Sequence, residues 1–290
     1  MIRVTADLHL RLDVPLCRGE TEEEWLMLQR KSLEAFFDVP GHQDKLVIAG
    51  DIFHRPVSSP KLVNMIHDAS YCNEGDGETY IMAGNHDLQM RNKDVSATSY
   101  QSVLYGENFM PIENTFSCIP YDEEKPVGPK TDILFLHRLV FPSDSAIPPG
   151  SDGISAKDLL ALYPDYRLIV AGDNHDGFLY EEKGRVVLVP GSMTIQSAKA
   201  IDKRCYFYDI DFKEQELKIT KHLFPDTGNM VTREHIDKAN EREERLTAFV
   251  EALKKGGETS FDFEASVLGM LNNSDMKEDT KTMVKEFLYG

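Results

Sequence analysis

The chain has 290 residues, a formal net charge of −17, and 41% hydrophobic and 28% charged residues. A chain of this length and balance forms one large domain with a small appendage, or two modest domains, around a sizeable core. Its acidity disfavours a protein that binds nucleic acid through a broad basic surface. Divalent cations can make a carboxylate-lined pocket attractive to phosphate, so the charge does not exclude a phosphate-containing ligand.

The chain shows no sign of a disulfide framework, a leader or a membrane span. Its cysteines are scattered, at Cys17, Cys72, Cys118 and Cys205. No C-x-x-C pair is present, which argues against a zinc ribbon or a redox dithiol. Met1 leads directly into a strand-like run, and no apolar stretch approaches the roughly 20 residues that span a bilayer. We therefore expect a soluble, cytoplasmic protein that does not associate with membranes.

Short apolar strands alternate with helical patterns over the first two-thirds of the chain. The predicted strands are Ile2–Ala6, Leu46–Ala49, Tyr80–Met82, Ile133–Leu136, Leu168–Ala171 and Val186–Val189. A capping box at Thr21–Glu24 begins one predicted helix, and Ser59 followed by Pro60 begins another. Strands that alternate with helices indicate an α/β architecture with much parallel pairing.

The last third changes character. Cys205–Asp211 and Leu217–His222 are predicted to form a hairpin, and Pro142–Gly153 before them is predicted to be a loop rather than a linker. A charged helix is predicted over Thr232–Lys255, where Gly256 and Gly257 stop it. Shorter helices are predicted from about Phe263 to Leu271 and from Ser274 to Leu288. We therefore divide the chain into a catalytic domain, residues 1–225, and a helical C-terminal region, residues 226–290.

Residues of metal-ligand type follow five predicted strands at their carboxyl ends. They are Asp7 and His9; Asp51 and His54; Asn85, His86 and Asp87; His137; and Asp173 and His175. Taken singly, each has an ordinary interpretation: Asp51 reads more readily as a helix N-cap, and His137 as a histidine at the edge of the core. Ligands bind at this edge of open α/β sheets, however, and five coincidences there favour a metal site.

The predicted ligands offer oxygen and imidazole donors without a thiolate, a set that suits Mn²⁺, Fe, Zn²⁺ or Mg²⁺. Seven of these residues are candidate ligands, which is more than one ion needs, so a bridged pair of ions is the simplest interpretation. Two ions about 3.5–4 Å apart can hold a phosphoryl group and activate water for in-line attack. A bridged pair of divalent ions of this kind suits the hydrolysis of phosphate esters, and these donors alone leave the metal open among Mn²⁺, Fe, Zn²⁺ and Mg²⁺.

The order D-x-H, G-D, G-N-H-D, H and G-x-x-H resembles the calcineurin-like metallophosphoesterase superfamily over roughly residues 1–225. The resemblance implies a four-layer αββα sandwich of two mixed sheets with the metal pair at the strand ends. It also implies the site roles: Asp7, His9 and His175 bind one ion, Asn85, His137 and Asp173 bind the other, Asp51 bridges both, and His86 is the general acid or phosphate contact, oriented by Asp87.

One position departs from the superfamily pattern. Members usually have G-H-x-H where this chain has Gly172-Asp173-Asn174-His175. A carboxylate can replace an imidazole ligand, and Asp173 would favour a harder ion such as Mn²⁺ or Mg²⁺. Occupancy of the second metal site therefore depends on Asp173.

Within the superfamily, the chain looks most like the SbcD-type DNA-repair exonucleases of bacteria and phages. The resembling residues are His54, three positions after Asp51, the strand that ends at His137, and the P-G-S turn in Val189–Met193. This resemblance implies that His54 helps to position the DNA phosphate. It also implies a role in DNA repair and recombination with an SMC-like ATPase of the SbcC type, and a homodimer is compatible with it.

The partner would bind the C-terminal helices. In the last of these, apolar side chains share one face: Met276, Met283, Val284, Phe287 and Leu288. A solvated appendage, or helices that pack back on their own domain, would show the same pattern.

Two other functions compete with the nuclease. One is the same chemistry on a small substrate, by a nucleotide phosphodiesterase or phosphatase, which the net charge of −17 favours. The other is a metal-free scaffold that keeps the fold. Completeness of the ligand set argues against the scaffold, because only Asp173 deviates.

Overall fold

Two mixed β-sheets form the larger of two compact units, Met1–Thr232; the second unit is Arg233–Gly290. The computed structural model describes residues 1–38, 45–71, 78–89, 94–213, 216–226, 230–255, 268–269 and 281–282. No helix among these residues is long and apolar enough to cross a membrane.

The first sheet has the strand order β13-β12-β1-β2-β3-β4. Its strands are β1 (Ile2–Thr5), β2 (Lys45–Ala49), β3 (Thr79–Met82), β4 (Phe109–Pro111), β12 (Tyr206–Lys213) and β13 (Glu216–Leu223). Strands β1 to β4 are parallel, whereas β12 is antiparallel to both β1 and β13, with Val4 opposite Tyr208. The four parallel strands β1 to β4 therefore end at the same edge of the sheet.

The second sheet has the strand order β10-β11-β9-β6-β5. Its strands are β5 (Ser117–Ile119), β6 (Ile133–His137), β9 (Leu168–Gly172), β10 (Phe178–Glu182) and β11 (Arg185–Val189). All neighbours pair in parallel except β10 and β11. A separate parallel pair, β7 (Val140–Phe141) and β8 (Ile154–Ser155), brackets the Pro/Gly-rich loop.

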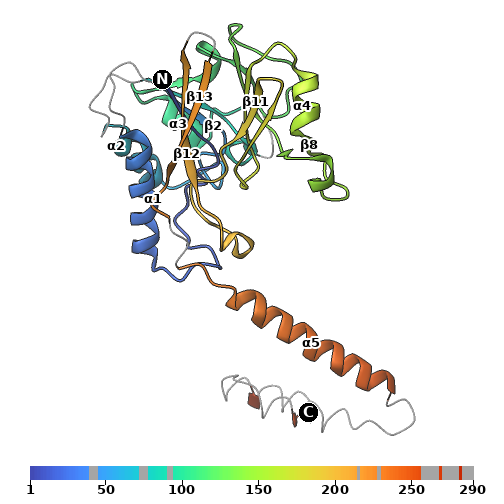
Figure 1. Ribbon diagram of the computed structural model, residues 1–290. Helices are drawn as coiled ribbons and strands as arrows, with labels where there is room; N and C mark the ends of the chain where they lie inside the picture. The colour runs from blue at the N-terminus through green and yellow to red at the C-terminus, as the bar shows by residue number, and fades with distance from the viewer. Residues whose placement is uncertain are drawn as a thin grey trace. The chain divides into compact units, whose positions relative to one another are not determined.

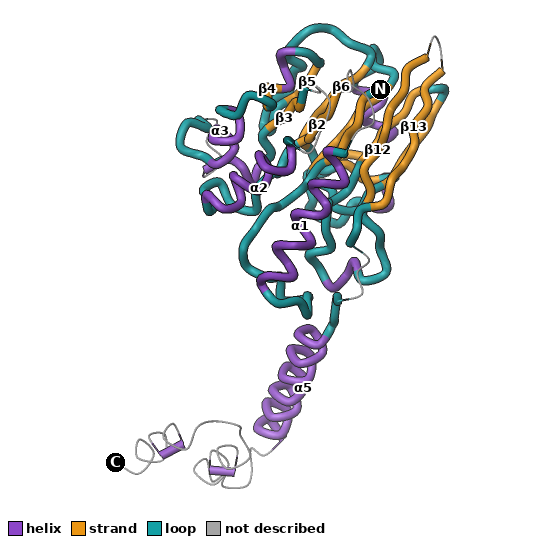
Figure 2. Tube along the Cα trace, turned by 90° about the vertical axis from the view of Figure 1, so that its left-hand side faces the viewer, coloured by secondary structure: helices purple, strands orange, loops and turns teal. Residues whose placement is uncertain are grey.

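Helices lie on the outer faces of both sheets (Figure 1). In the larger unit they are α1 (Glu22–Phe37), α2 (Pro60–Ser70), α3 (Ser99–Leu104) and α4 (Ala156–Leu162), and the smaller unit contains α5 (Glu234–Lys255). The predicted capping box is present, because the Thr21 N–H donates to the Glu24 side chain at 2.9 Å and Thr21 Oγ1 accepts from the Glu24 N–H. Figure 2 shows α1, α2 and α3 together beside the first sheet.

Alternation along the strands produces two apolar layers. One face of β6 contributes Phe135 to the core between the sheets, where it meets Val4 and Val47 of the first sheet. The other face contributes Leu134, which packs with Leu159 of α4. Each such fully buried side chain contributes about 1.5–3 kcal/mol. Helices, sheet, sheet and helix therefore form four layers, which confirms the predicted αββα sandwich.

The predicted strands are present with small changes at their ends. Strands β4, β5, β7 and β8 were not predicted, because each has only two or three residues. Strand β10 was not predicted either, since its side chains are exposed or half-buried and lack an apolar run. The expected helices over 263–271 and 274–288 lie almost entirely outside the described residues, so the partner-docking role of this region stays a prediction.

Arg18 ties the start of the larger unit to its end. Its guanidinium donates to Asp226 at 2.9 Å and to the Ile195 carbonyl at 3.1 Å, and it also pairs with Glu20. The side chains of Arg18 and Asp226 are only 2% and 1% exposed. A buried pair of this kind leaves an uncompensated charge when one partner is removed.

We therefore expect Arg18→Ala to lower the free energy of unfolding by about 3–5 kcal/mol. Lys130→Ala is the matched control, because it removes an exposed ion pair with Asp165 and should cost less than about 1 kcal/mol. Urea unfolding followed by circular dichroism measures both. Equal losses in the two variants would contradict the structural role of Arg18.

Candidate metal centre

The carboxyl ends of β1, β2, β3, β6 and β9 meet at one place. β1, β2 and β3 are parallel neighbours in the first sheet, and β6 and β9 are parallel neighbours in the second. The Asp7 N–H donates to the Gly50 carbonyl at 3.1 Å, which joins the loops after β1 and β2. His137 Nδ1 lies 3.0 Å from the Ala49 carbonyl, which joins the two sheets at this edge.

One carboxylate oxygen connects two groups of donor atoms. Asp51 Oδ2 lies 3.5 Å from His9 Nε2 and 3.4 Å from His137 Nε2. On one side, His9 Nε2 faces His175 Nε2 at 2.8 Å. On the other side, His137 Nε2 lies 3.0 Å from Asn85 Oδ1. Asp51 Oδ2 is therefore the shared corner of two donor sets.

These separations fit the coordination shell of a small divalent ion. Ligands about 2.1 Å from an ion lie roughly 3.0 Å apart at right angles and roughly 3.4 Å apart at tetrahedral angles. The distances between donors, from 2.8 to 3.5 Å, match these values on both sides of Asp51. Nitrogen and oxygen donors without thiolate suit the metals that the sequence predicted.

Asp7 lies beside Asp51 and His137. One oxygen of Asp7 is within 4.8 Å of donor atoms of Asp51 and His137, and all three side chains are buried. Both oxygens of Asp7 accept the Asp173 N–H, at 3.0 and 3.1 Å. Its placement is compatible with a ligand role, while its assignment to the ion of His9 and His175 stays a prediction.

The backbone fixes which nitrogen of His137 can bind a metal. A carbonyl oxygen only accepts hydrogen bonds, so Nδ1, which faces Ala49 O, carries a proton and Nε2 is left for a ligand. Burial lowers the pKa of His137, but the Asp51 carboxylate outweighs burial and raises it to about 10. Metal binding must therefore displace a proton from Nε2.

Burial makes negative charge costly at this site. It raises the pKa of Asp7 well above its usual value, and the nearby charge of Asp51 raises it further. It also raises the pKa of Asp173, where Asp51 again contributes. Asp51 differs: burial acts to raise its pKa, but His137 lowers it below the usual range. A bound cation would offset the repulsion among these carboxylates.

The backbone turns sharply at four of the predicted ligands. Their φ angles lie in the left-handed region: Asp7 (51°), His9 (45°), Asp51 (50°) and Asp173 (83°). Such conformations cost about 1–3 kcal/mol each and cluster at functional sites, where the surrounding structure holds them in place.

Two glycines make room for the cluster. A Cβ atom at Gly50, whose φ is 97°, would lie 2.1 Å from His137 Nδ1. A Cβ atom at Gly84 would lie 2.1 Å from Asp51 Oδ1. A larger residue at position 50 would displace the loop after β2 from His137, and a larger residue at position 84 would displace the loop after β3 from Asp51.

Asp87 acts on the backbone rather than on the His86 ring. Its buried carboxylate accepts the N–H groups of Ile52, Phe53 and Gly84 at 3.0–3.1 Å. Burial raises its pKa to about 7, and the negative charge of Asp51 adds to this effect. The predicted orientation of the His86 ring by Asp87 is therefore corrected: Asp87 joins the loop after β2 to the loop that carries His86.

His54 and His86 lie beside the donor groups. Their rings stack with centroids 5.5 Å apart, and a nitrogen of each lies within 4.8 Å of a His9 nitrogen. The His86 N–H donates to Asp51 Oδ1 at 2.9 Å, and His86 Nδ1 faces the His54 carbonyl at 3.0 Å. All ten residues singled out in the sequence are thus brought to one place.

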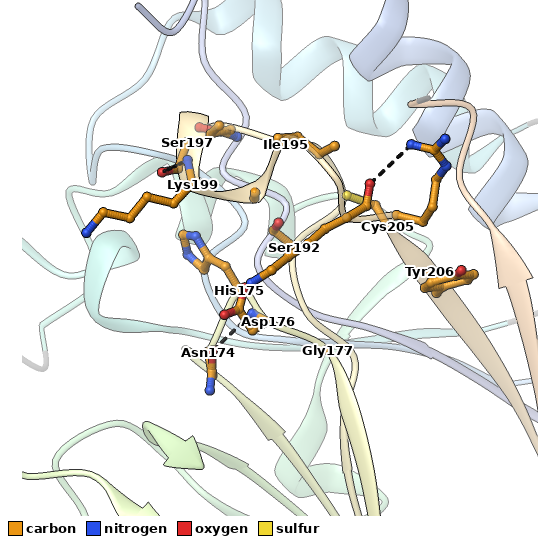
Figure 3. Close-up of a pocket in the computed structure, with 14 residues that line it drawn as sticks. Asn174, His175, Asp176, Gly177, Ser192, Ile195, Ser197, Lys199, Cys205 and Tyr206 are labelled. Atoms are coloured by element: carbon orange, nitrogen blue, oxygen red, sulfur yellow. Dashed lines mark hydrogen bonds and ion pairs between the residues drawn. The ribbon is translucent and has the colours of Figure 1, made fainter. Parts of the chain in front are cut away.

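The structure adds residues that the sequence did not single out. Tyr121 places its ring edge-on to His137, with centroids 6.3 Å apart. Gln196 Nε2 donates to the His9 carbonyl at 3.3 Å. A pocket beside His175 is lined by Lys199 (Figure 3) and also by Lys203. The P-G-S turn was the only sequence signal near Gln196, and no local motif marks the lysines.

The shared Asp51 oxygen predicts unequal effects of two substitutions on Mn²⁺ binding. Asp51→Asn should weaken the binding of both ions by well over tenfold, because both donor sets lose their common charge. Asp173→Asn should weaken only one of them. Titration with Mn²⁺ followed by electron paramagnetic resonance gives affinity and stoichiometry, and Asp176→Asn, on the same loop, is the control. Two tightly bound ions in Asp51→Asn would contradict the shared corner.

The solved structures that match the chain have little sequence in common with it. Vps29 from Entamoeba histolytica is 15% identical, with 78% of this chain and 94% of that chain covered and a TM-score of 0.38. An archaeal phosphodiesterase is 13% identical, with 76% and 99% covered and a TM-score of 0.38. Phosphopantetheinyl hydrolase from Mycobacterium tuberculosis is 12% identical, with 66% and 88% covered and a TM-score of 0.39. No curated protein matches the chain in sequence.

A family model decides the classification. The model of the calcineurin-like phosphoesterases matches residues 1–211, which include every residue of the candidate metal centre. The chain belongs to the calcineurin-like phosphoesterase family.

Proposed function

We propose that the chain is a metal-dependent nuclease of the SbcD type, which hydrolyses phosphodiester bonds of DNA in repair or recombination. The observation that carries the hydrolase is the Asp51 oxygen shared by two donor sets. The choice of DNA is supported by the resemblance of the motifs and by basic residues beside His54.

The family uses divalent metal ions, and the donors present here fit them. The proposed ligands are Asp7, His9 and His175 for one ion, Asn85, His137 and Asp173 for the other, and Asp51 for both. When bound, two such ions neutralise charge on a phosphoryl group and lower the pKa of water, so no separate general base is required. Mn²⁺ is the proposed metal, because Asp173 adds a hard oxygen donor.

In this proposal His86 acts on the substrate. Its Nδ1 donates to the His54 carbonyl, which fixes the ring and leaves Nε2 as the atom that faces away from this bond. In its protonated form, the ring can give the Nε2 proton to the leaving oxygen or hold a phosphate oxygen. His54 stacks on this ring and supports its orientation.

Positive charge lies beside His54 although the chain is acidic. Burial is the largest of the causes that lower the pKa of His54 to about 4; the charges of Arg11 and Arg55 contribute to that value, while Asp13, which pairs with Arg11, opposes them. The Arg55 side chain is exposed, and the Arg11 side chain is 16% exposed. A phosphate chain that passes His54 would meet these guanidinium groups, whereas a small ester would not need them.

The second candidate is the same chemistry on a small substrate. The net charge of −17 favours it, because long-range repulsion opposes the approach of DNA. A metal-free scaffold is disfavoured by the complete donor sets on both sides of Asp51.

Linear DNA and bis(p-nitrophenyl) phosphate, each tested with Mn²⁺, distinguish the two candidates. We expect the protein to cut DNA into shorter fragments or nucleotides, and to cleave the small ester as well, because both present a phosphodiester to the same centre. Chelation with EDTA should abolish both activities. Cleavage of the ester without any cleavage of DNA would favour the small-substrate enzyme.

His86→Ala should retain Mn²⁺ but lose about 10²–10⁴-fold in kcat, because His86 is placed for the phosphate rather than for the ions. His222→Ala is the control, since His222 lies on β13 and pairs with Asp209. Metal content by mass spectrometry is measured with kcat on the small ester. If His86→Ala loses its metal as well as its activity, then His86 is a ligand and its proposed role is wrong.

A further inference from the structure

A pocket of about 520 Å³ opens beside His175. Its walls come from the loop after β9, the turn 192–197, the short helix Ala198–Ala200 and the start of β12. Figure 3 shows His175 among the lining residues, with Lys199 extended from the opposite chain segment. One proposed ligand, His175, is therefore also part of the pocket wall.

Hydrogen bonds fix the pocket relative to the metal centre. The Ser192 N–H donates to the His175 carbonyl at 3.3 Å. Gln196 Nε2 donates to the His9 carbonyl at 3.3 Å, and the Ile195 N–H donates to buried Asp226 at 2.8 Å. The wall that carries the cations is thus held by the same loops that carry two of the proposed ligands.

The pocket is cationic in a chain of net charge −17. Lys199, Lys203 and Arg204 line it, and among the residues that the structure describes Asp176 is the one carboxylate in its lining. Asp176 pairs with Lys203, and Arg204 donates to the Lys203 carbonyl at 3.3 Å, so Lys199 is the cation that carries the proposed phosphate contact. Like charges gathered in a concave site concentrate the local potential and attract an anion.

The uncharged lining suits the remainder of a nucleotide. Hydroxyl and amide groups come from Ser192, Ser197 and Gln196, and apolar surface comes from Ile195 and Tyr206. Lysine is a common point-charge partner of phosphate, and hydroxyl groups also contact phosphate and sugar. The volume lies within the range of sites for small organic molecules.

We propose that this pocket binds the backbone phosphate of the nucleotide next to the scissile phosphodiester, so that the DNA strand runs from the metal centre past His175 toward Lys199. This assignment rests on the proposed nuclease function. Together with Arg11 and Arg55 near His54, the pocket supplies local positive charge in a chain whose net charge of −17 opposes DNA binding. A small ester with a single phosphate does not reach the pocket.

The test compares binding of a short fluorescein-labelled single-stranded oligonucleotide by the full chain and by its variants, in Ca²⁺ to avoid turnover. Fluorescence anisotropy is measured over a series of salt concentrations. The variants are Lys199→Ala, Lys199→Arg and the double variant Lys199→Ala with Arg204→Ala. Lys218→Ala, which removes an exposed lysine of β13, is the control.

We expect Lys199→Ala to raise Kd about tenfold and to reduce the slope of log K against log salt by about 0.7, the value for one lost phosphate contact on a single strand. The double variant should reduce the slope further, and Lys199→Arg should retain most of it. The ratio of activity on the oligonucleotide to activity on bis(p-nitrophenyl) phosphate should fall most in the double variant, less in Lys199→Ala and least in Lys199→Arg.

The pocket assignment alone is overturned if Lys199→Ala and the double variant bind the oligonucleotide as Lys218→Ala does, with the same Kd and salt slope, while the wild type cuts DNA. A wild type that cleaves the ester but neither binds nor cuts the oligonucleotide would overturn the nuclease function, and the pocket assignment with it. Inorganic phosphate or a mononucleotide should compete less strongly than unlabelled oligonucleotide. Equal competition would show that the pocket binds a single phosphate, and this result also overturns the proposed path of the strand.

Discussion

The candidate metal centre depends on the placement of a single oxygen atom, Asp51 Oδ2. It lies within 3.5 Å of His9 Nε2, from the loop after β1 of the first sheet, and of His137 Nε2, from the end of β6 in the second sheet. The other oxygen accepts the His86 N–H, and the missing Cβ of Gly84 leaves room for it. Asp87 then joins the backbones after β2 and β3 through three hydrogen bonds. Because these contacts constrain one another, the two donor sets meet at a fixed corner.

This arrangement is costly without a cation, and the remainder of the fold compensates for the cost. Four ligand positions have left-handed backbone conformations, and burial raises the pKa values of Asp7 and Asp173. Two apolar layers, one between the sheets and one under α4, hold the strand ends in register against this strain. Divalent cations would relieve the electrostatic part, since they neutralise the carboxylates that burial and proximity destabilise. Metal binding should therefore also stabilise the folded chain.

The sequence predicted the fold and the position of the site, because apolar strands and the polar residues that follow them are local patterns. His9, Asp51 and His137 could be assigned to one edge, since parallel strands end together. The role of Asp87 could not be predicted, because its partners are backbone N–H groups, two of which lie far away in sequence. The cationic pocket was also missed, since Lys199 and His175 come from separate loops and ordinary surface lysines show the same local sequence. Exposed strand β10 lacks the apolar run on which strand prediction relies.

Anomalous scattering from crystals grown with Mn²⁺, recorded at the manganese absorption edge, tests the shared Asp51 oxygen most directly. The account predicts two peaks about 3.5–4 Å apart. Asp51 should contact both, His9 and His175 should bind one, and Asn85 and His137 should bind the other. A single peak, or two peaks of which only one contacts Asp51, would contradict the dinuclear centre.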